Sequence, residues 1–206
     1  MKTTTLRRTG ALALAAALSL GVSACGSSSS DNSPANASAK SGSSSTMAEN
    51  AGTQTFGPGC KLIPKNGAGS FNGMATAPVA TAASANPLLT TLVAAVGKAG
   101  LADTLNSAKS LTVFAPTDDA FNKIPKKALA GVLADKATLT KILTHHVIAG
   151  KLSPSQLAGT HKTLAGDTVT VKGSGSNFTV DGAKVLCGNI PTANATVYVI
   201  DSVLMP

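Results

Sequence analysis

The sequence predicts an α+β domain, because helical and strand patterns fall in different halves of the chain. Apolar residues recur at helical spacing between Asn86 and Gly150, and from Lys162 onward the spacing changes to alternation. The pair Asp181-Gly182 lies between two alternating segments and is typical of a tight hairpin turn. Helices in the first half and antiparallel hairpins in the second indicate two layers around one core.

The helical half contains several segments with their own start and stop signals. Asn86-Pro87 predicts a helix start, because asparagine caps helices and proline is favoured at the first helical position, and Gly97 or Gly100 ends that segment. Further helices are predicted over 101–105, 126–133 and 135–150. In the last of them Asp135 is the expected cap, and one apolar face is shared by Leu139, Ile142, Leu143 and His146.

The ten residues from Thr112 to Phe121 predict a strand, a sharp turn and the start of a helix. Pro116 removes a ladder donor and ends the strand. Thr117 is the expected N-cap of the next helix, and Asp118 and Asp119 place negative charge at its positive dipole end. An acid/base pair is the alternative function for these aspartates, but neighbours in the first turn of a helix do not face each other.

Four strands are predicted in the second half of the chain, near residues 169–171, 178–180, 184–187 and 196–203. A turn over 172–177 joins the first two. His161 is expected in a loop before them. The alternation of the last strand continues almost to the C-terminus.

The first 24 residues have the composition of an export signal. An apolar run from Ala11 to Val22 follows a basic segment and is too short to span a bilayer. Val22-Ser-Ala-Cys25 resembles the bacterial lipobox, which implies cleavage before Cys25 and lipid attachment to that residue. Simple cleavage, giving a secreted protein without lipid, is the alternative. Arg7-Arg8 hints at twin-arginine export, which the following Thr9-Gly10 fits poorly.

Residues 25–55 form a predicted tether between the lipid and the domain, which we expect over residues 56–206. The segment is rich in Ser, Ala, Asn and Gly, so it cannot bury enough apolar surface to offset the entropy of ordering. The expected location is the extracellular face of the cell membrane, with release from the cell as a second form.

Composition restricts the function of this chain further. The net charge is +8, but the basic residues are scattered, no arginine follows Arg8 and aromatic residues make up only 3%. A nucleic-acid surface would need clustered cations interleaved with stacking rings. Catalytic Gly-x-Ser-x-Gly elbows, phosphate-binding loops and dinucleotide fingerprints are missing from the sequence. We therefore predict a non-enzymatic protein with no cofactor and no metal site.

With Cys25 assigned to lipid, two cysteines remain for the domain. Outside the cytoplasm, such a pair predicts a disulfide, here between Cys60 and Cys187. A redox pair or a zinc site is the alternative. The sequence has neither a Cys-x-x-Cys motif nor a histidine pair at zinc spacing, which speaks against both.

Two segments, Thr112–Phe121 and Ala195–Pro206, resemble the signature segments of the fasciclin domain family. They occur in the family's order and at a domain-sized separation, and the resemblance covers roughly residues 71–206. It implies a single compact fasciclin domain with both segments in its core. Within the family, a subgroup of mycobacterial secreted antigens and surface lipoproteins is similar to this chain over Asp103–Ser107, Thr192–Thr196 and Val199–Pro206. That likeness implies one disulfide and an actinobacterial source.

The segment Ile142–Val147 resembles the family's tyrosine–histidine motif, which is linked to cell adhesion through integrins. His146 matches the histidine, and His145 stands where the family usually has tyrosine. The alternative is a core histidine, since His146 lies on the apolar face of its predicted helix. Adjacent residues point about 100° apart on a helix, so the two histidines make a poor metal pair.

These observations leave two functions from different classes. The first is a monomeric, lipid-anchored surface protein that adheres to cells, matrix or wall polymers through an unknown protein or polysaccharide partner. The alternative is an exported lipoprotein that binds a small lipid or glycan, which an apolar cleft would favour and a filled core would not. A hydrolase would need a nucleophile within reach of a base, and the sequence names no such pair.

Overall fold

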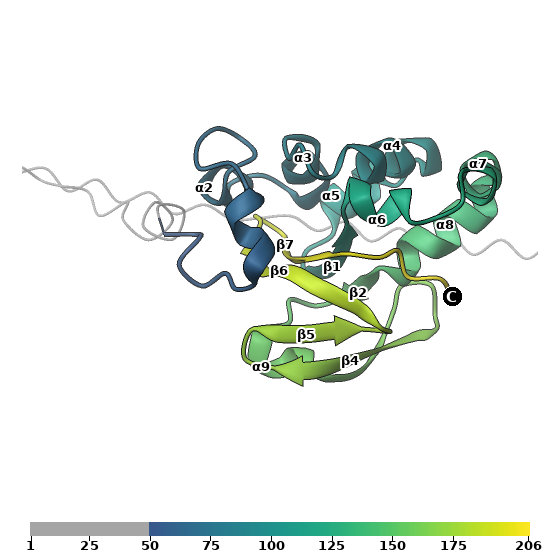
Figure 1. Ribbon diagram of the computed structural model, residues 1–206. Coiled ribbons are helices and arrows are strands. Elements are labelled where there is room, and N and C mark those ends of the chain that lie inside the picture. The colour runs from purple at the N-terminus through teal and green to yellow at the C-terminus, as the bar shows by residue number, and fades with distance from the viewer. Residues whose placement is uncertain (1–49) are drawn as a thin grey trace, which may run out of the picture. The chain divides into compact units, whose positions relative to one another are not determined.

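The computed structural model describes residues 50–206 of the chain, and the predictions for Cys25, the export signal and most of the tether lie outside these residues. Helices gather on one side of a set of strands (Figure 1). Helices occupy the first part of the domain and most strands the second, so the predicted α+β fasciclin architecture is confirmed. None of the helices between residues 50 and 206 has the length and apolarity needed to cross a membrane.

The helices are short, and none in the described region exceeds ten residues. Isolated helices of this length are marginal in water, so they depend on packing and on caps. Their bounds are η1, a 3-10 turn (Pro58–Leu62), α2 (Phe71–Ala75), α3 (Val79–Ser84), α4 (Thr90–Ala99), α5 (Ala102–Ser107), α6 (Asp118–Asn122), α7 (Lys126–Ala134), α8 (Lys136–His145) and α9 (Pro154–Leu157).

Seven strands form one sheet in the order β2-β1-β7-β6-β5-β4-β3. Only the neighbours β1 and β7 run parallel, and the other pairs are antiparallel. A bridge between Ile148 and Thr163 joins β2 to the residue after β3, so the two edges of the sheet meet. The strands are β1 (Leu111–Pro116), β2 (Val147–Ala149), β3 (Gly159–Lys162), β4 (Thr168–Ser174), β5 (Asn177–Val180), β6 (Ala183–Pro191) and β7 (Ala195–Ile200).

The parallel pair β1–β7 separates two apolar clusters. Side chains alternate along a strand, so one face of the pair presents Val113 and Val197 to the helices. The other face presents Phe114 and Tyr198 to a second cluster, which the curled strands β4, β5 and β6 enclose. Both strands are buried along their whole length. The two signature segments therefore form the centre of the domain, as the resemblance implied.

Two helix boundaries differ from the prediction. Helix α4 begins at Thr90, because the Asn86 side chain instead accepts a hydrogen bond from the Leu88 amide at 3.0 Å and closes a turn before the helix. Helix α8 ends at His145, and the following residues form β2 on the edge of β1. Gly100 ends α4 in the left-handed conformation, with φ of 73°.

The sheet has strands that the sequence did not predict. His161 lies in β3 and not in a loop, and its Nε2 lies 2.8 Å from the Leu157 carbonyl oxygen. Strand β4 continues to Ser174, so the turn before β5 is shorter than the predicted 172–177. The predicted turn at Asp181-Gly182 is present with positive φ at both residues. The domain begins earlier than the predicted residue 56, because Ala51 is already buried.

A disulfide joins Cys60 of η1 to Cys187 of β6, with 4.8 Å between the Cα atoms. Beside it, Phe56 and Gly188 exchange backbone hydrogen bonds of 3.2 and 2.8 Å. The Phe56 ring lies over Gly188 so closely that a Cβ there would come within 2.3 Å of it, so any other residue would have to displace the ring. The segment that enters the domain is thus fixed to the middle of the sheet.

We expect loss of the disulfide to lower the free energy of unfolding by about 2–5 kcal/mol, because the bond closes most of the domain in the unfolded chain. The test is urea unfolding of the full chain and of the double variant Cys60→Ser/Cys187→Ser, each with and without reductant. Reductant should bring the wild type to the stability of the variant and leave the variant unchanged. Equal stability of the oxidised wild type and the variant would contradict this.

Candidate functional site

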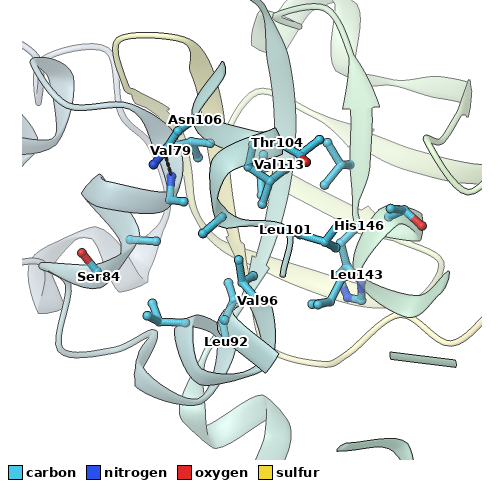
Figure 2. A pocket seen from close by; sticks show the side chains of 18 of the residues that line it. Val79, Ser84, Leu92, Val96, Leu101, Thr104, Asn106, Val113, Leu143 and His146 are labelled. Atoms are coloured by element: carbon cyan, nitrogen blue, oxygen red, sulfur yellow. Dashed lines mark hydrogen bonds between the residues drawn. The ribbon is translucent and has the colours of Figure 1, made fainter. Parts of the chain in front are cut away.

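An apolar cavity of about 310 Å³ opens between helices α3, α4, α5 and α8 and strand β1 (Figure 2). Buried Leu92, Val113 and Leu143 line it from three of these elements. Val96 and Leu101 are half-buried and face the same space. None of the described residues that line the cavity carries a formal charge at neutral pH. The domain core is therefore open at one place rather than filled.

Most polar side chains along the cavity are already bonded to the protein. Ser84 donates to the Thr81 carbonyl at 2.7 Å, and Thr144 donates to the Thr140 carbonyl at 2.8 Å. The Asn106 carbonyl oxygen accepts from the Ala80 amide at 2.9 Å. Among residues 50–206, no buried side-chain nitrogen or oxygen lacks a partner. The cavity wall thus offers few free hydrogen-bonding groups.

Helix α4, one wall of the cavity, is capped by a residue from elsewhere in the chain. The residue at its N-cap position, Leu89, makes no side-chain hydrogen bond to the helix. The Asp118 carboxylate accepts from the Thr91 amide and from the Thr90 hydroxyl, both at 2.7 Å. Burial acts to raise the pKa of Asp118, but these hydrogen bonds outweigh it and lower the pKa.

The predicted cap at Thr117 is also present, since its hydroxyl accepts from the Ala120 amide at 3.2 Å. Thr117 and Asp118 directly follow β1, so two adjacent residues start two different helices, α6 and α4. Asp119 is exposed. The aspartates therefore have a structural role, and the acid/base alternative is unsupported.

Helix α3, on another side of the cavity, is held by Asn194, just before β7. The Asn194 carbonyl oxygen accepts from the Val79 amide at 2.8 Å, where the local N-cap Pro78 has nothing to offer. The Asn194 amide donates to the carbonyls of Leu105 and Ala108, at 2.7 and 2.9 Å, at the end of α5. One buried side chain therefore joins α3, α5 and the sheet. No local pattern marks this role, because the contacts span 86 residues or more.

His146 is buried at the end of α8 and uses both ring nitrogens. The Leu204 amide donates to Nε2 at 2.9 Å, so Nδ1 carries the proton and donates to the Ile142 carbonyl at 2.8 Å. Burial lowers the pKa of His146 to about 4, which leaves the ring neutral at physiological pH. This geometry fits the core-histidine interpretation, with the C-terminal segment held against α8.

His145 points away from His146 and contacts the sheet. Its Nδ1 lies 2.7 Å from Asp167 Oδ1, and its Nε2 lies 4.0 Å from Asp181 Oδ2. The Thr163 hydroxyl donates to the same oxygen of Asp167, and this bond is the main cause that lowers the pKa of Asp167. The Thr163 hydroxyl and the His145 imidazole thus both bond to the Asp167 carboxylate. Nucleophilic catalysis would require the imidazole to lie between the hydroxyl and the carboxylate.

The structure does not bring the predicted histidine pair to the surface. Both side chains are buried, and their rings are nearly perpendicular, at 88°. A binding partner could contact only the surface that these residues support, so an adhesive role for His145 and His146 stays a prediction. In the part of the chain that the structure describes, no group of three or more potential ligand residues is arranged to hold a metal ion.

Comparison with known proteins gives consistent matches. The fasciclin domain profile matches residues 87–206. Immunogenic protein MPB70 of Mycobacterium bovis is 49% identical over 158 residues, which cover 73% of this chain and 81% of that protein. Cell surface glycolipoprotein MPT83 of Mycobacterium tuberculosis is 48% identical over 172 residues, covering 80% and 77%. Protein sll1483 of Synechocystis is 38% identical over 127 residues, covering 60% and 71%.

We expect Asp118→Ala to lower the free energy of unfolding by about 1 kcal/mol, the usual cost of losing a helix cap. Asp119→Ala is the matched control, because it removes the same charge from the same helix turn without touching α4. Urea unfolding measures the stability, and hydrogen exchange of the Thr91 amide reports the cap directly. Equal effects of the two substitutions would show that Asp118 acts only through its charge on α6.

We expect His146 to make stability fall as the pH drops from 6.5 toward 4. The ring is neutral in the folded state, but it takes up a proton near pH 6.5 in the unfolded state, so acid favours unfolding. The full effect is about 3 kcal/mol, reached near pH 4. The measurement is the unfolding free energy of the wild type and of His146→Gln at pH 7, 5.5 and 4.5. The difference between the two proteins should shrink as the pH falls, and a constant difference would refute the assignment.

Proposed function

The chain belongs to the fasciclin domain family, and on that premise we propose that it is a surface adhesion protein. A lipid on Cys25 holds it at the extracellular face of the membrane, and the fasciclin domain binds other cells, matrix or wall polymers. Its relatives are described as immunogenic proteins and cell surface glycolipoproteins, and the chain is accordingly a non-enzymatic member of this group.

The sequence and one group of relatives support the proposal that a lipid on Cys25 anchors the protein. The lipobox-like Val22-Ser-Ala-Cys25 would leave Cys25 at the new N-terminus with its lipids. Several acyl chains hold a protein to a bilayer far longer than one. The name of MPT83 describes a lipoprotein at the cell surface, and its match covers 80% of this chain. The residues between Cys25 and the domain would connect lipid and domain.

The observation that carries the adhesion proposal is the disulfide where the chain enters the domain. An adhesion protein is pulled between its anchor and its partner. Here the pull from the anchor arrives near Cys60 and passes through the covalent bond into β6 at Cys187. Helices α2 to α9 lie in the loop that this bond closes, so force from the N-terminal side cannot unravel them one by one. This arrangement suits a tethered domain that bears load.

The test compares cells that carry the full chain with a deletion strain and with two variants. Cys25→Ser should abolish both surface display and adhesion, because the lipid is lost. Cys60→Ser/Cys187→Ser should keep part of the adhesion at rest but detach at lower shear, at equal surface amounts measured by antibody. Adhesion is measured under flow on host cells, matrix proteins and isolated wall polymer.

Two results would overturn the proposal. A deletion strain that adheres like the wild type to all three surfaces would remove the adhesive role. Equal detachment shear for the wild type and the double cysteine variant, at equal display, would remove the mechanical role of the disulfide.

A further inference from the structure

We infer that the cavity between α3, α4, α5, α8 and β1 is a binding site for a neutral ligand with an acyl-type hydrocarbon chain. This activity goes beyond adhesion and does not depend on it. The volume of about 310 Å³ lies at the lower end of the range for small-molecule sites in proteins.

The walls are apolar where a ligand would lie. Val93, Val96, Leu101 and Leu105 all line the cavity and are only half-buried, so part of their apolar surface faces water. Covering such surface is favourable in proportion to its area. A ligand in the cavity would cover these half-buried side chains and give them the close packing that buried Leu92 already has.

The polar groups decide the class of ligand. No Lys or Asp lines the cavity among the described residues, so neither a carboxylate nor a cation would find a partner. The side chains of Ser84, Asn106, Thr144 and His146 are engaged within the protein. A sugar would bury many hydroxyl groups without partners, whereas a hydrocarbon chain requires none. The lipid alternative is therefore favoured over the glycan.

The lining of the cavity includes an exposed apolar side chain, Leu164. Val79 of α3 and Leu143 of α8 lie on opposite sides of the cavity (Figure 2). Leu164 lines it next to Val147, and its amide donates to the Val147 carbonyl at 2.8 Å. Leu164 is nevertheless 46% exposed, one of three large apolar residues that residues 50–206 leave open to solvent. A hydrocarbon chain that lies in the cavity and extends past Val147 would cover the exposed part of Leu164.

Gly97 lies at the cavity on the side of α4. It lines the cavity, is exposed, and has nothing within 4 Å of where a Cβ would lie. A Cβ at this position would lie in open space, and we expect a leucine there to narrow the opening, in a helix where leucine is a better former than glycine. Gly131 of α7 has the same properties but does not line the cavity. The two positions form a matched pair for substitution.

The experiment titrates the full chain carrying Cys25→Ser with N-phenyl-1-naphthylamine, a neutral apolar dye whose fluorescence rises on leaving water. We expect saturable binding of one dye per chain. Gly97→Leu should weaken the affinity at least about tenfold, or 1.4 kcal/mol. Gly131→Leu should bind like the parent. Thermal unfolding of both variants checks that the domain remains folded.

Competition experiments show whether the hydrocarbon chain that binds belongs to a free molecule or to a membrane lipid. Displacement by dodecan-1-ol or by phosphatidylcholine vesicles supports the acyl-chain class, and the stronger competitor shows whether a free chain or a membrane lipid is preferred. Displacement by trehalose but by neither apolar competitor would overturn the inference. So would an absence of saturable binding, or equal dye affinity in Gly97→Leu and Gly131→Leu. Val96→Thr, which keeps the shape of the wall but adds a hydroxyl, should also weaken binding.

Discussion

The domain depends on side chains next to the two central strands that cap helices far away in sequence. Its helices are too short to be stable alone, and α3 and α4 have no capping residue at the usual position. Asp118, just after β1, closes the start of α4, and Asn194, just before β7, closes the start of α3. Because β1 and β7 are parallel neighbours, the pair carries one cap at each end. The helical layer is thus attached to the sheet within the first signature segment and directly before the second.

Apart from the Cys60–Cys187 disulfide, the sequence predicted features that depend on neighbouring residues and missed features that depend on distant ones. Local caps at Thr117 and Asp135, the Gly100 helix end and the Asp181-Gly182 turn are all present, since each acts within a few residues. The start of α4 was wrong because its cap, Asp118, lies 27 residues from Thr91. Edge strands β2 and β3 carry little alternation, and the cavity is a gap between helices. Neither leaves a pattern that a single sequence shows.

The motif at His145 and His146 gains a physical explanation that its family resemblance did not supply. The two rings point in different directions and hold different parts of the fold. His146 binds the C-terminal segment at Leu204, and His145 binds the loop before β4 through Asp167. Since the two residues stand at the end of α8, the motif joins this helix to the C-terminal segment and to the loop before β4. Substitution there would disturb the domain's architecture first and any surface property as a consequence.

The meeting of the two sheet edges at Ile148 and Thr163 affects how copies of the domain can associate at high concentration. A free edge strand exposes unpaired amides and carbonyls and can add strands from neighbouring molecules, which leads to aggregates. In this sheet the Leu164 amide already donates to the Val147 carbonyl, so that edge of β2 is occupied by the chain itself. Many copies at high local concentration could therefore lie side by side without pairing through their sheets. High surface density is compatible with this fold.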